Sequence, residues 1–149
     1  MINEIFEDEI LNQPDDMKTT IDFIRSRYES IEFKRDKINR LIFVGSGDSY
    51  IAPHSLLLLI YKYINAHILI LTPSDVYNYN YDENDLIVLI SFSGESKQLL
   101  RAKTFIKNFN CEVFSITYNS NNPISSGCNY KYKIPIKSNR LTPHATDYM

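Results

Sequence analysis

The chain has 149 residues, a net charge of −2 and hydrophobic residues at 44% of its positions. A chain of this length is the size of one domain and buries about 68–70% of its unfolded surface, so a full core forms without disulfide staples. Charges of both signs are spread along the chain, which argues against nucleic-acid binders because these concentrate Lys and Arg on one face.

The first predicted element is a lead-in helix over about residues 12–36. Pro14 stands where the first turn of a helix tolerates proline, and the acidic residues Asp15 and Asp16 suit the positive end of a helix. Apolar residues then recur at three- and four-residue steps, at Ile21, Ile24, Tyr28 and Ile31. The spacing predicts one apolar face, and we expect this face to favour self-association.

From Leu41 onwards, short apolar runs alternate with longer helical ones, as in βαβ units with a parallel sheet. The expected strands are Leu41–Val44, His67–Leu71, Leu86–Ile90, Val113–Thr117 and Tyr130–Ile136, and the expected helices are Tyr50–Tyr63 and Ser96–Phe109. The tyrosine-rich segment Tyr77–Tyr81 predicts a half-buried loop or short turn. The α/β core therefore spans about residues 40–137, and residues 138–149 form a tail of the same single domain.

Five strands with right-handed crossovers predict an α/β fold, a three-layer αβα sandwich with a parallel sheet in the flavodoxin-like order 2-1-3-4-5. Pro135 and alternating polarity suit the last strand to an edge of the sheet. In this order the first and third strands are neighbours, and the helices after them leave toward opposite faces. The topological switch point, where open α/β sheets bind ligands, then falls between the two segments that follow these strands.

A serine-rich turn follows each of these two strands. The first serine turn is Gly45–Tyr50 (Gly-Ser-Gly-Asp-Ser-Tyr), and the second serine turn is Ser91–Ser96 (Ser-Phe-Ser-Gly-Glu-Ser). Glycines let a ligand approach the main-chain amides, and uncharged hydroxyls at a helix start suit a phosphate monoester or another small anion. Either turn alone is explained equally well as a helix cap. Two of them at the switch point favour a binding site.

The sequence motifs of other common ligand-binding and catalytic sites are not matched by this chain. Tyr50 replaces the third glycine of the dinucleotide fingerprint, the second turn is not a G-x-S-x-G elbow, and no Walker A lysine follows a glycine loop. Cys111 and Cys128 are too few for a disulfide framework and lack metal-ligand spacing. No basic leader opens the chain, and Lys62 interrupts its most apolar stretch. We expect a cytoplasmic protein with no cofactor, metal, membrane or nucleic-acid partner.

The two turns resemble those of the SIS (sugar isomerase) domain family, most closely the first SIS half of the isomerase part of glucosamine-6-phosphate synthases. The family has G-x-G-T/S-S at the first turn and S-x-S-G-E/N-T/S at the second. The resemblance extends to Asn12-Gln13-Pro14 and to Ile116-Thr117 with Asn122-Pro123-Ile124. It implies a phosphosugar ligand, such as fructose 6-phosphate or glucosamine 6-phosphate. The apolar face of the lead-in helix predicts a homodimer or higher homo-oligomer. The phosphate-binding residues that the resemblance implies are Gly47, Ser49, Ser91, Ser93, Gly94 and Ser96.

Two residues depart from the family pattern. Asp48 stands where the synthases have threonine, and Phe92 where they have glutamine. A carboxylate about 5 Å from a phosphate charge costs on the order of 3 kcal/mol at an effective dielectric near 20. Asp48 therefore points away, accepts sugar hydroxyls or marks a changed ligand, and Phe92 packs under the turn in place of a polar contact.

The resemblance leaves catalysis open. In the synthases the glutamate, histidine and lysine that move protons lie in a second SIS half and a tail beyond this sequence. Asp48 and His144 are the candidate proton-transfer groups of this chain, with Glu95 and His54 as weaker ones. The alternatives are a binding module or half of a two-domain isomerase or deaminase, a complete single-domain isomerase with a site shared across an oligomer, and a structural partner that has lost the ligand.

Overall fold

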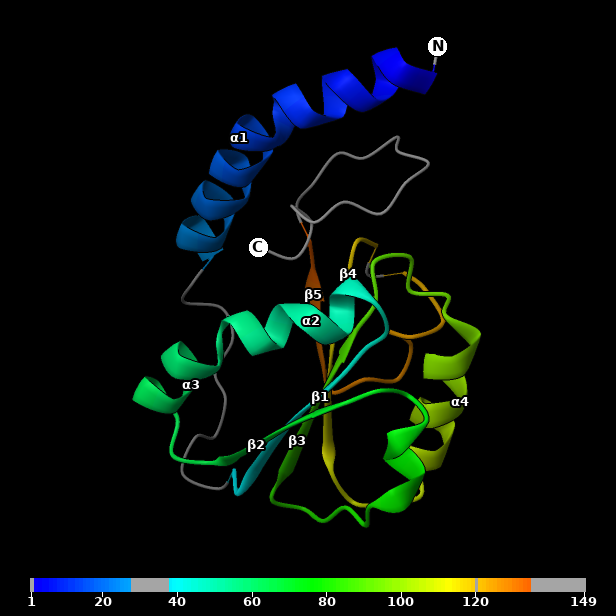
Figure 1. Ribbon diagram of the computed structural model, residues 1–149. Helices are drawn as coiled ribbons and strands as arrows, with labels where there is room; N and C mark the ends of the chain where they lie inside the picture. The colour runs from blue at the N-terminus through cyan, green and yellow to red at the C-terminus, as the bar shows by residue number, and fades with distance from the viewer. Residues whose placement is uncertain (1, 28–37, 120, 135–149) are drawn as a thin grey trace. The chain divides into compact units, whose positions relative to one another are not determined.

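The computed structural model describes residues 2–27, 38–119 and 121–134, so the predicted tail over residues 138–149 lies outside the described residues. The described residues fall in two units. One contains the helix α1 (Ile2–Arg27), and the other, Lys34–Ile134, contains a sheet with its helices (Figure 1).

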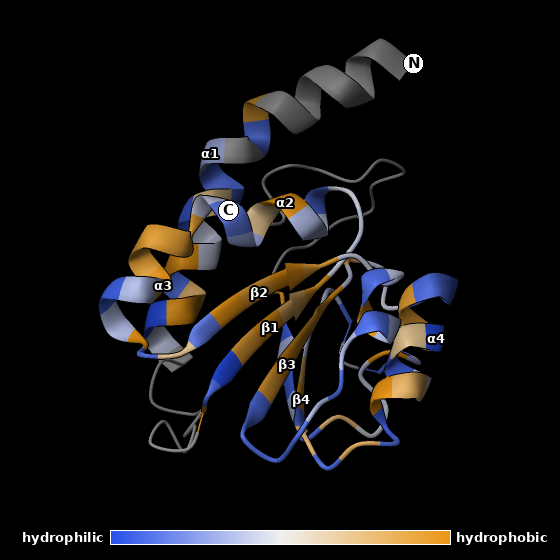
Figure 2. Ribbon diagram, turned by 60° about the horizontal axis from the view of Figure 1, so that its bottom comes forward, coloured by the Kyte–Doolittle hydropathy of each residue, from blue (hydrophilic) through white to orange (hydrophobic). Residues whose placement is uncertain are grey.

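The sheet has five parallel strands in the order β2-β1-β3-β4-β5, which confirms the predicted α/β fold and strand order. The strands are β1 (Arg40–Val44), β2 (His67–Leu71), β3 (Asp85–Ile90), β4 (Glu112–Thr117) and β5 (Tyr130–Lys133). Helices cover both faces, α2 and α3 on one and α4 on the other (Figure 2). Every residue of β3 is buried, as a central strand in three layers requires, and β5 lies at an edge as predicted.

The main core lies between the sheet and α4 (Lys97–Ile106). Alternate residues of the strands point to this face, because successive side chains of a strand leave on opposite sides. The fully buried members on the strands and α4 are Ile42, Val44, Ile87, Leu89, Leu99, Ala102 and Ile106. This packing fixes α4, and with it the second serine turn before it.

The helix predicted over Tyr50–Tyr63 is two helices, α2 (Asp48–Ser55) and α3 (Leu57–Tyr63). Pro53 inside α2 has no N–H, so the carbonyl of Ser49 cannot receive the regular helical bond. The last turn closes instead with a bond from the Leu56 N–H to the Pro53 carbonyl, at 3.2 Å. The helix predicted over Ser96–Phe109 is shorter than expected, since Ser96 is its N-cap and it ends at Ile106.

The lead-in helix also differs from its prediction. The structure has α1 over Ile2–Arg27, so Pro14 lies inside the helix and not in its first turn. An interior proline removes one main-chain bond and leaves the others, which lets a long helix continue past it. Ile21 and Ile24 are exposed on α1, whereas Tyr28 and Ile31 lie outside the described residues.

The connection between β2 and β3 contains a short 3₁₀ helix, η3 (Asp75–Asn78), in agreement with the predicted turn. Tyr81 is buried, donates to the Val76 carbonyl at 2.8 Å and packs edge-on against Phe109. The tyrosine segment is therefore partly a packing element. Within the described ranges, no helix has both the length and the hydropathy needed to cross a bilayer.

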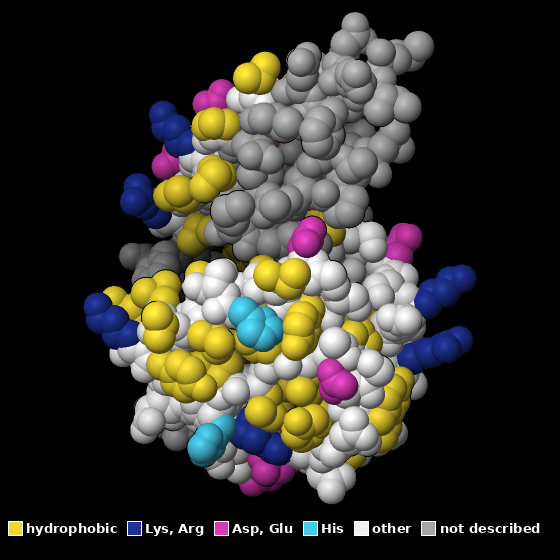
Figure 3. Space-filling view, viewed as in Figure 1, with side chains coloured by type: hydrophobic (Ala, Val, Ile, Leu, Met, Phe, Trp, Pro, Cys, Tyr) yellow, Lys and Arg dark blue, Asp and Glu magenta, His cyan; other side chains and the backbone are white. Residues whose placement is uncertain are grey.

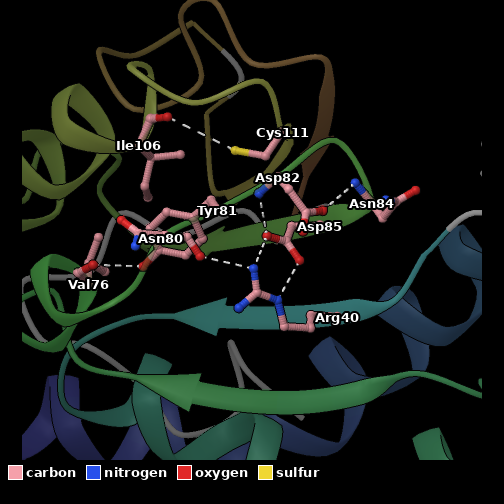
Figure 4. Close-up of polar contacts among 9 residues, drawn as sticks. All are labelled: Arg40, Val76, Asn80, Tyr81, Asp82, Asn84, Asp85, Ile106 and Cys111. Atoms are coloured by element: carbon pink, nitrogen blue, oxygen red, sulfur yellow. Dashed lines mark hydrogen bonds and ion pairs between the residues drawn. The ribbon is translucent and has the colours of Figure 1, made fainter.

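An ion pair joins β1 and β3 at the end of the sheet opposite the serine turns (Figure 4). Arg40 Nε and Asp85 Oδ1 lie 2.6 Å apart, and a second guanidinium nitrogen lies 2.5 Å from Asp85 Oδ2. Asp85 is fully buried at its side chain and also accepts the Asp82 N–H at 2.8 Å. The bidentate geometry gives the pair direction as well as charge, and it fixes the register of the two central strands.

We predict that Asp85→Ala lowers the free energy of unfolding by about 3 kcal/mol, because it leaves Arg40 without its buried partner. The matched control is Asp82→Ala, which removes an exposed carboxylate that accepts the Asn84 N–H within its own turn and attracts Arg40 by its charge without a hydrogen bond to it. Its cost is expected to stay near 1 kcal/mol. Urea unfolding monitored by circular dichroism measures both, and equal losses would contradict the role given to the ion pair.

Candidate functional site

The first serine turn joins β1 to α2. Gly45 is obligatory there, because a Cβ would lie 2.6 Å from the main-chain oxygen of Ser49. Gly47 is the N-cap of α2 and has a φ of 58°, a left-handed value that favours glycine. Its carbonyl accepts the N–H groups of Tyr50 and Ile51 at 3.0 and 3.1 Å. The turn thus presents the start of α2, with Ser49 buried in its first turn.

The second serine turn joins β3 to α4, and its three hydroxyls share one arrangement. Ser91 Oγ accepts the Gly94 N–H at 3.2 Å, Ser93 Oγ accepts the Glu95 N–H at 3.2 Å, and Ser96 Oγ caps α4 by accepting the Leu99 N–H at 3.4 Å. Each oxygen is thereby oriented by the main chain, and each O–H still has a proton to donate. Ser91 is buried, Ser96 half-buried and Ser93 exposed.

The sheet brings the two turns to the same edge. β1 and β3 are parallel neighbours in the register Val44↔Leu89, so both turns begin at the carboxyl ends of adjacent strands. Strands paired in this way lie about 4.8 Å apart. The six residues expected to bind phosphate all belong to these two turns: Gly47, Ser49, Ser91, Ser93, Gly94 and Ser96.

A buried polar cluster lies behind the second serine turn. We define it as Ser115, Thr117, Asn122 and Ser125. The hydroxyls of Ser115 and Thr117 each lie 3.0 Å from Ser125 Oγ, and the Asn122 amide donates to Thr117 Oγ1 and Ser125 Oγ at 3.0 and 3.1 Å. Three of the four residues are fully buried. A buried network with its members hydrogen-bonded is rigid, because breaking any bond exposes a polar atom to an apolar surrounding.

This cluster contacts the turn at Gly94, whose φ is 70°. A Cβ at Gly94 would overlap the side-chain carbon and oxygen of Asn122, so the asparagine occupies the space that any other residue would need. The Ile124 N–H also donates to the Gly94 carbonyl at 3.1 Å. The glycine of the second serine turn is therefore required by its backbone angle and by close packing.

The two departures from the family pattern have distinct surroundings. Phe92 stacks on Tyr118 with ring centroids 5.2 Å apart, and its carbonyl accepts the Tyr118 N–H at 3.0 Å. The ring thus packs against the end of β4. Asp48 is exposed in the first turn of α2, where the positive end of the helix stabilises a carboxylate.

The other candidate proton-transfer groups are spread out. Glu95 is exposed in the second serine turn. His54 lies in α2, where its Nδ1 is 3.0 Å from the Tyr50 carbonyl and its ring packs against the Tyr50 ring. His144 lies outside the described residues.

The two cysteines are not reactive thiols in this structure. Burial raises the pKa of the Cys111 thiol to about 11 and also raises the pKa of the Cys128 thiol, so both are protonated at neutral pH. Among the described residues, no three His, Cys, Asp or Glu side chains gather closely enough to hold a metal ion.

Sequence reasoning missed the buried polar cluster. The sequence of β4 contained a signal for it. Ser115 and Thr117 stand at buried positions of this strand, on the same side as Val113, where apolar residues are the rule. Polar residues at core positions of a strand need hydrogen-bond partners, which here come from residues five to ten positions further along the chain.

Comparison with known proteins identifies similar chains. A family model described as SIS domain matches residues 35–145. A glutamine–fructose-6-phosphate aminotransferase (isomerizing) of Sulfolobus acidocaldarius is 32% identical over 88% of this chain. The matching region is 22% of that protein, so this chain corresponds to less than a quarter of its length.

Two solved structures have the same fold. The C-terminal domain of glucosamine-fructose-6-phosphate aminotransferase from Francisella tularensis superposes with a TM-score of 0.72 at 21% identity, over 88% of this chain and 39% of that one. The NanR protein of Vibrio vulnificus, solved in complex with ManNAc-6P, has a TM-score of 0.62 at 16% identity, over 91% of this chain and 55% of that one.

We predict that Gly94→Ala lowers the free energy of unfolding by about 3 kcal/mol, from a left-handed alanine and from overpacking against Asn122. Gly127→Ala is the matched control, since it has the same φ of 70° and its added Cβ would meet only the flexible end of the Lys107 side chain, at 3.1 Å. That substitution should cost about 1 kcal/mol. Denaturant unfolding of the two variants measures the difference, and equal losses would show that Asn122 does not restrict the turn.

Proposed function

The chain belongs to the SIS domain family, and on this premise we propose that it binds a phosphosugar through the two serine turns. The observation that carries the proposal is the arrangement of Ser91, Ser93 and Ser96, whose oxygens are each held by a main-chain N–H while their O–H groups remain to donate. Donors oriented in advance bind an anion without the entropy cost of ordering them.

The starts of α2 and α4 strengthen this site for an anion. Both helices begin directly after the serine turns, so the positive ends of two helix dipoles meet at one edge of the sheet. Hydroxyl and amide donors suit the dianion of a phosphate monoester, which accepts several hydrogen bonds.

We assign Asp48 to the sugar and not to the phosphate. Its carboxylate is exposed at the start of α2, and a phosphate about 5 Å away would be repelled by about 3 kcal/mol at an effective dielectric near 20. Sugar hydroxyls, in contrast, donate readily to a carboxylate. This assignment also leaves Asp48 within the site as the carboxylate available for proton transfer.

The proposed ligands are fructose 6-phosphate and glucosamine 6-phosphate. The curated relative carries fructose 6-phosphate in its name, and the Vibrio vulnificus structure holds ManNAc-6P. Since this chain corresponds to 22% of the curated relative, we propose a binding module or half of a two-domain isomerase or deaminase. The alternative is a single-domain isomerase whose site is completed by a second copy.

A second copy of the chain is supported by the face formed by α2 and α3, which we call the α2–α3 face. No residue of α3 is buried, and hydrophobic side chains gather on this side of the molecule (Figure 3). The exposed apolar residues are Ile51, Leu56, Leu58, Leu59, Tyr61 and Tyr63. Lys62 is the single charged residue between Ser49 and Ala66 in the sequence, so two copies can meet there symmetrically with little repulsion.

We predict that fructose 6-phosphate or glucosamine 6-phosphate raises the melting temperature, because a ligand at 100 times its dissociation constant adds about 2.7 kcal/mol. Ser93→Ala should weaken the affinity by roughly tenfold to a hundredfold, the effect of one hydrogen bond to a charged group. Ser55→Ala, at the far end of α2, is the control and should bind as the wild type does.

Thermal shift and calorimetry make these measurements, with unphosphorylated fructose as the negative ligand. Absence of any shift at millimolar sugar phosphate would refute the proposed function. Unchanged affinity of Ser93→Ala would mean that the phosphate binds elsewhere.

For the oligomer we predict a dimer or larger species at micromolar concentration in sedimentation velocity. Leu58→Glu places a charge on a side chain that is 89% exposed and should yield monomers without loss of folding. Thr104→Glu puts the same charge on the exposed surface of α4 and should leave the assembly intact. A monomeric wild-type chain would contradict this part of the proposal.

A further inference from the structure

Lys103, in the middle of α4, is a buried cation. Only 5% of the surface of this residue is exposed, although lysine is almost never buried unless it is paired. Its ammonium group donates to the Pro123 carbonyl at 2.8 Å and also to the Ser126 carbonyl. Both partners lie in one turn between β4 and β5, so the ammonium joins α4 to that turn.

Keeping a charge at this position is unfavourable. Burial is the main cause that lowers the pKa of Lys103, and Cys128 acts in the opposite direction. The positive charges of Lys107, which follows the end of α4, and of Lys131 on β5 lower the pKa further. An apolar residue would fill the same space without this cost. The two hydrogen bonds to the turn are what an apolar side chain could not supply.

The turn that Lys103 holds is the one that contacts the second serine turn. This turn begins at Asn122. The main-chain carbonyl of Asn122 accepts the Ser126 N–H at 3.0 Å, and its side-chain oxygen accepts the Ser125 N–H at 2.9 Å. Its side chain lies against Gly94, and the Ile124 N–H bonds the Gly94 carbonyl. Pro123, which accepts from Lys103, lies between these two contacts.

The same helix therefore fixes the serine turn twice. Ser96, the N-cap of α4, ends the serine turn directly, and Lys103, about two helical turns further on, holds the neighbouring turn that packs on Gly94. A shift of the Asn122–Ser126 segment would remove the contact that keeps the Gly94 main chain in place.

We propose that Lys103 is a positioning residue, which keeps the second serine turn in its ligand-binding arrangement by holding the Asn122–Ser126 turn against Gly94. The effect on ligand affinity rests on the proposed function. The effect on the turn itself does not require a ligand, so the two parts can be tested separately.

The test compares Lys103→Met with Arg101→Met. Methionine keeps the length and apolar stem of lysine and removes the ammonium. Arg101 lies on the same helix, is exposed, and serves as the matched control for the loss of one positive charge. Both chains are used at full length, and folding is checked by the melting temperature.

The first readout is amide hydrogen exchange by NMR without ligand. Lys103→Met should speed exchange at Gly94, Glu95 and Ile124 by at least about tenfold, whereas amides of β3 keep their protection, because the loss of a charge-assisted hydrogen bond acts locally. Arg101→Met should leave all of these rates unchanged. Unchanged exchange at the three amides in Lys103→Met would overturn the proposal.

The second readout is the affinity for fructose 6-phosphate by calorimetry. Lys103→Met should bind about tenfold or more weakly, and Arg101→Met as the wild type does. If the wild type binds no sugar phosphate, the proposed function fails, and the exchange result alone decides the positioning role. If the wild type binds and Lys103→Met binds equally well, the positioning role fails while the function stands.

If Lys103→Met does not fold, exchange in the wild type decides. Gly94 and Ile124 should then open together, with protection factors that agree within about threefold, since the two turns form one unit. Protection factors that differ by tenfold or more would show that the turns move independently and would overturn the proposal.

Discussion

The parallel pairing of β1 with β3 is the constraint on which the rest of the structure depends. It brings two strand ends that are 46 residues apart, Val44 and Ile90, to one edge of the sheet, and it sends the helices after them to opposite faces. Because both helices begin at this edge, their positive ends converge on the same space. The Arg40–Asp85 pair anchors the register at the other end of the same two strands.

The two serine turns are rigid for different reasons. The first is restricted by contacts and backbone angles within the turn itself, since Gly45 lies against Ser49 and Gly47 has a left-handed φ. The second is supported from outside, by the buried polar cluster and by the turn that Lys103 holds. The phosphate site that we propose needs such support, because neither turn contains a Lys or Arg to attract the ligand and binding relies on donors that are already oriented.

Much of the fold followed from local patterns. The β-branched and apolar runs located all five strands, and Pro135 with alternating polarity suited the last one to the edge that β5 occupies. The helix predictions were wrong in their boundaries. Pro14 lies inside α1 and not at its start, and one predicted helix is divided in two at Leu56, three residues after Pro53.

By itself, the sequence determined the strands and the two serine turns that follow them, because these depend on periodicity and on glycine and serine within a few residues of each other. The right-handed crossover rule then predicted the strand order, which places both turns at the switch point. Only the tertiary structure decided what holds the second turn. Ser115 and Asn122 are 21 and 28 residues from Gly94 in the sequence, Lys103 acts through two carbonyls that lie 20 and 23 residues beyond it, and each of the three looks ordinary in its own segment. Their role arises from burial, because a polar group removed from water must find its partner wherever the fold brings one within reach.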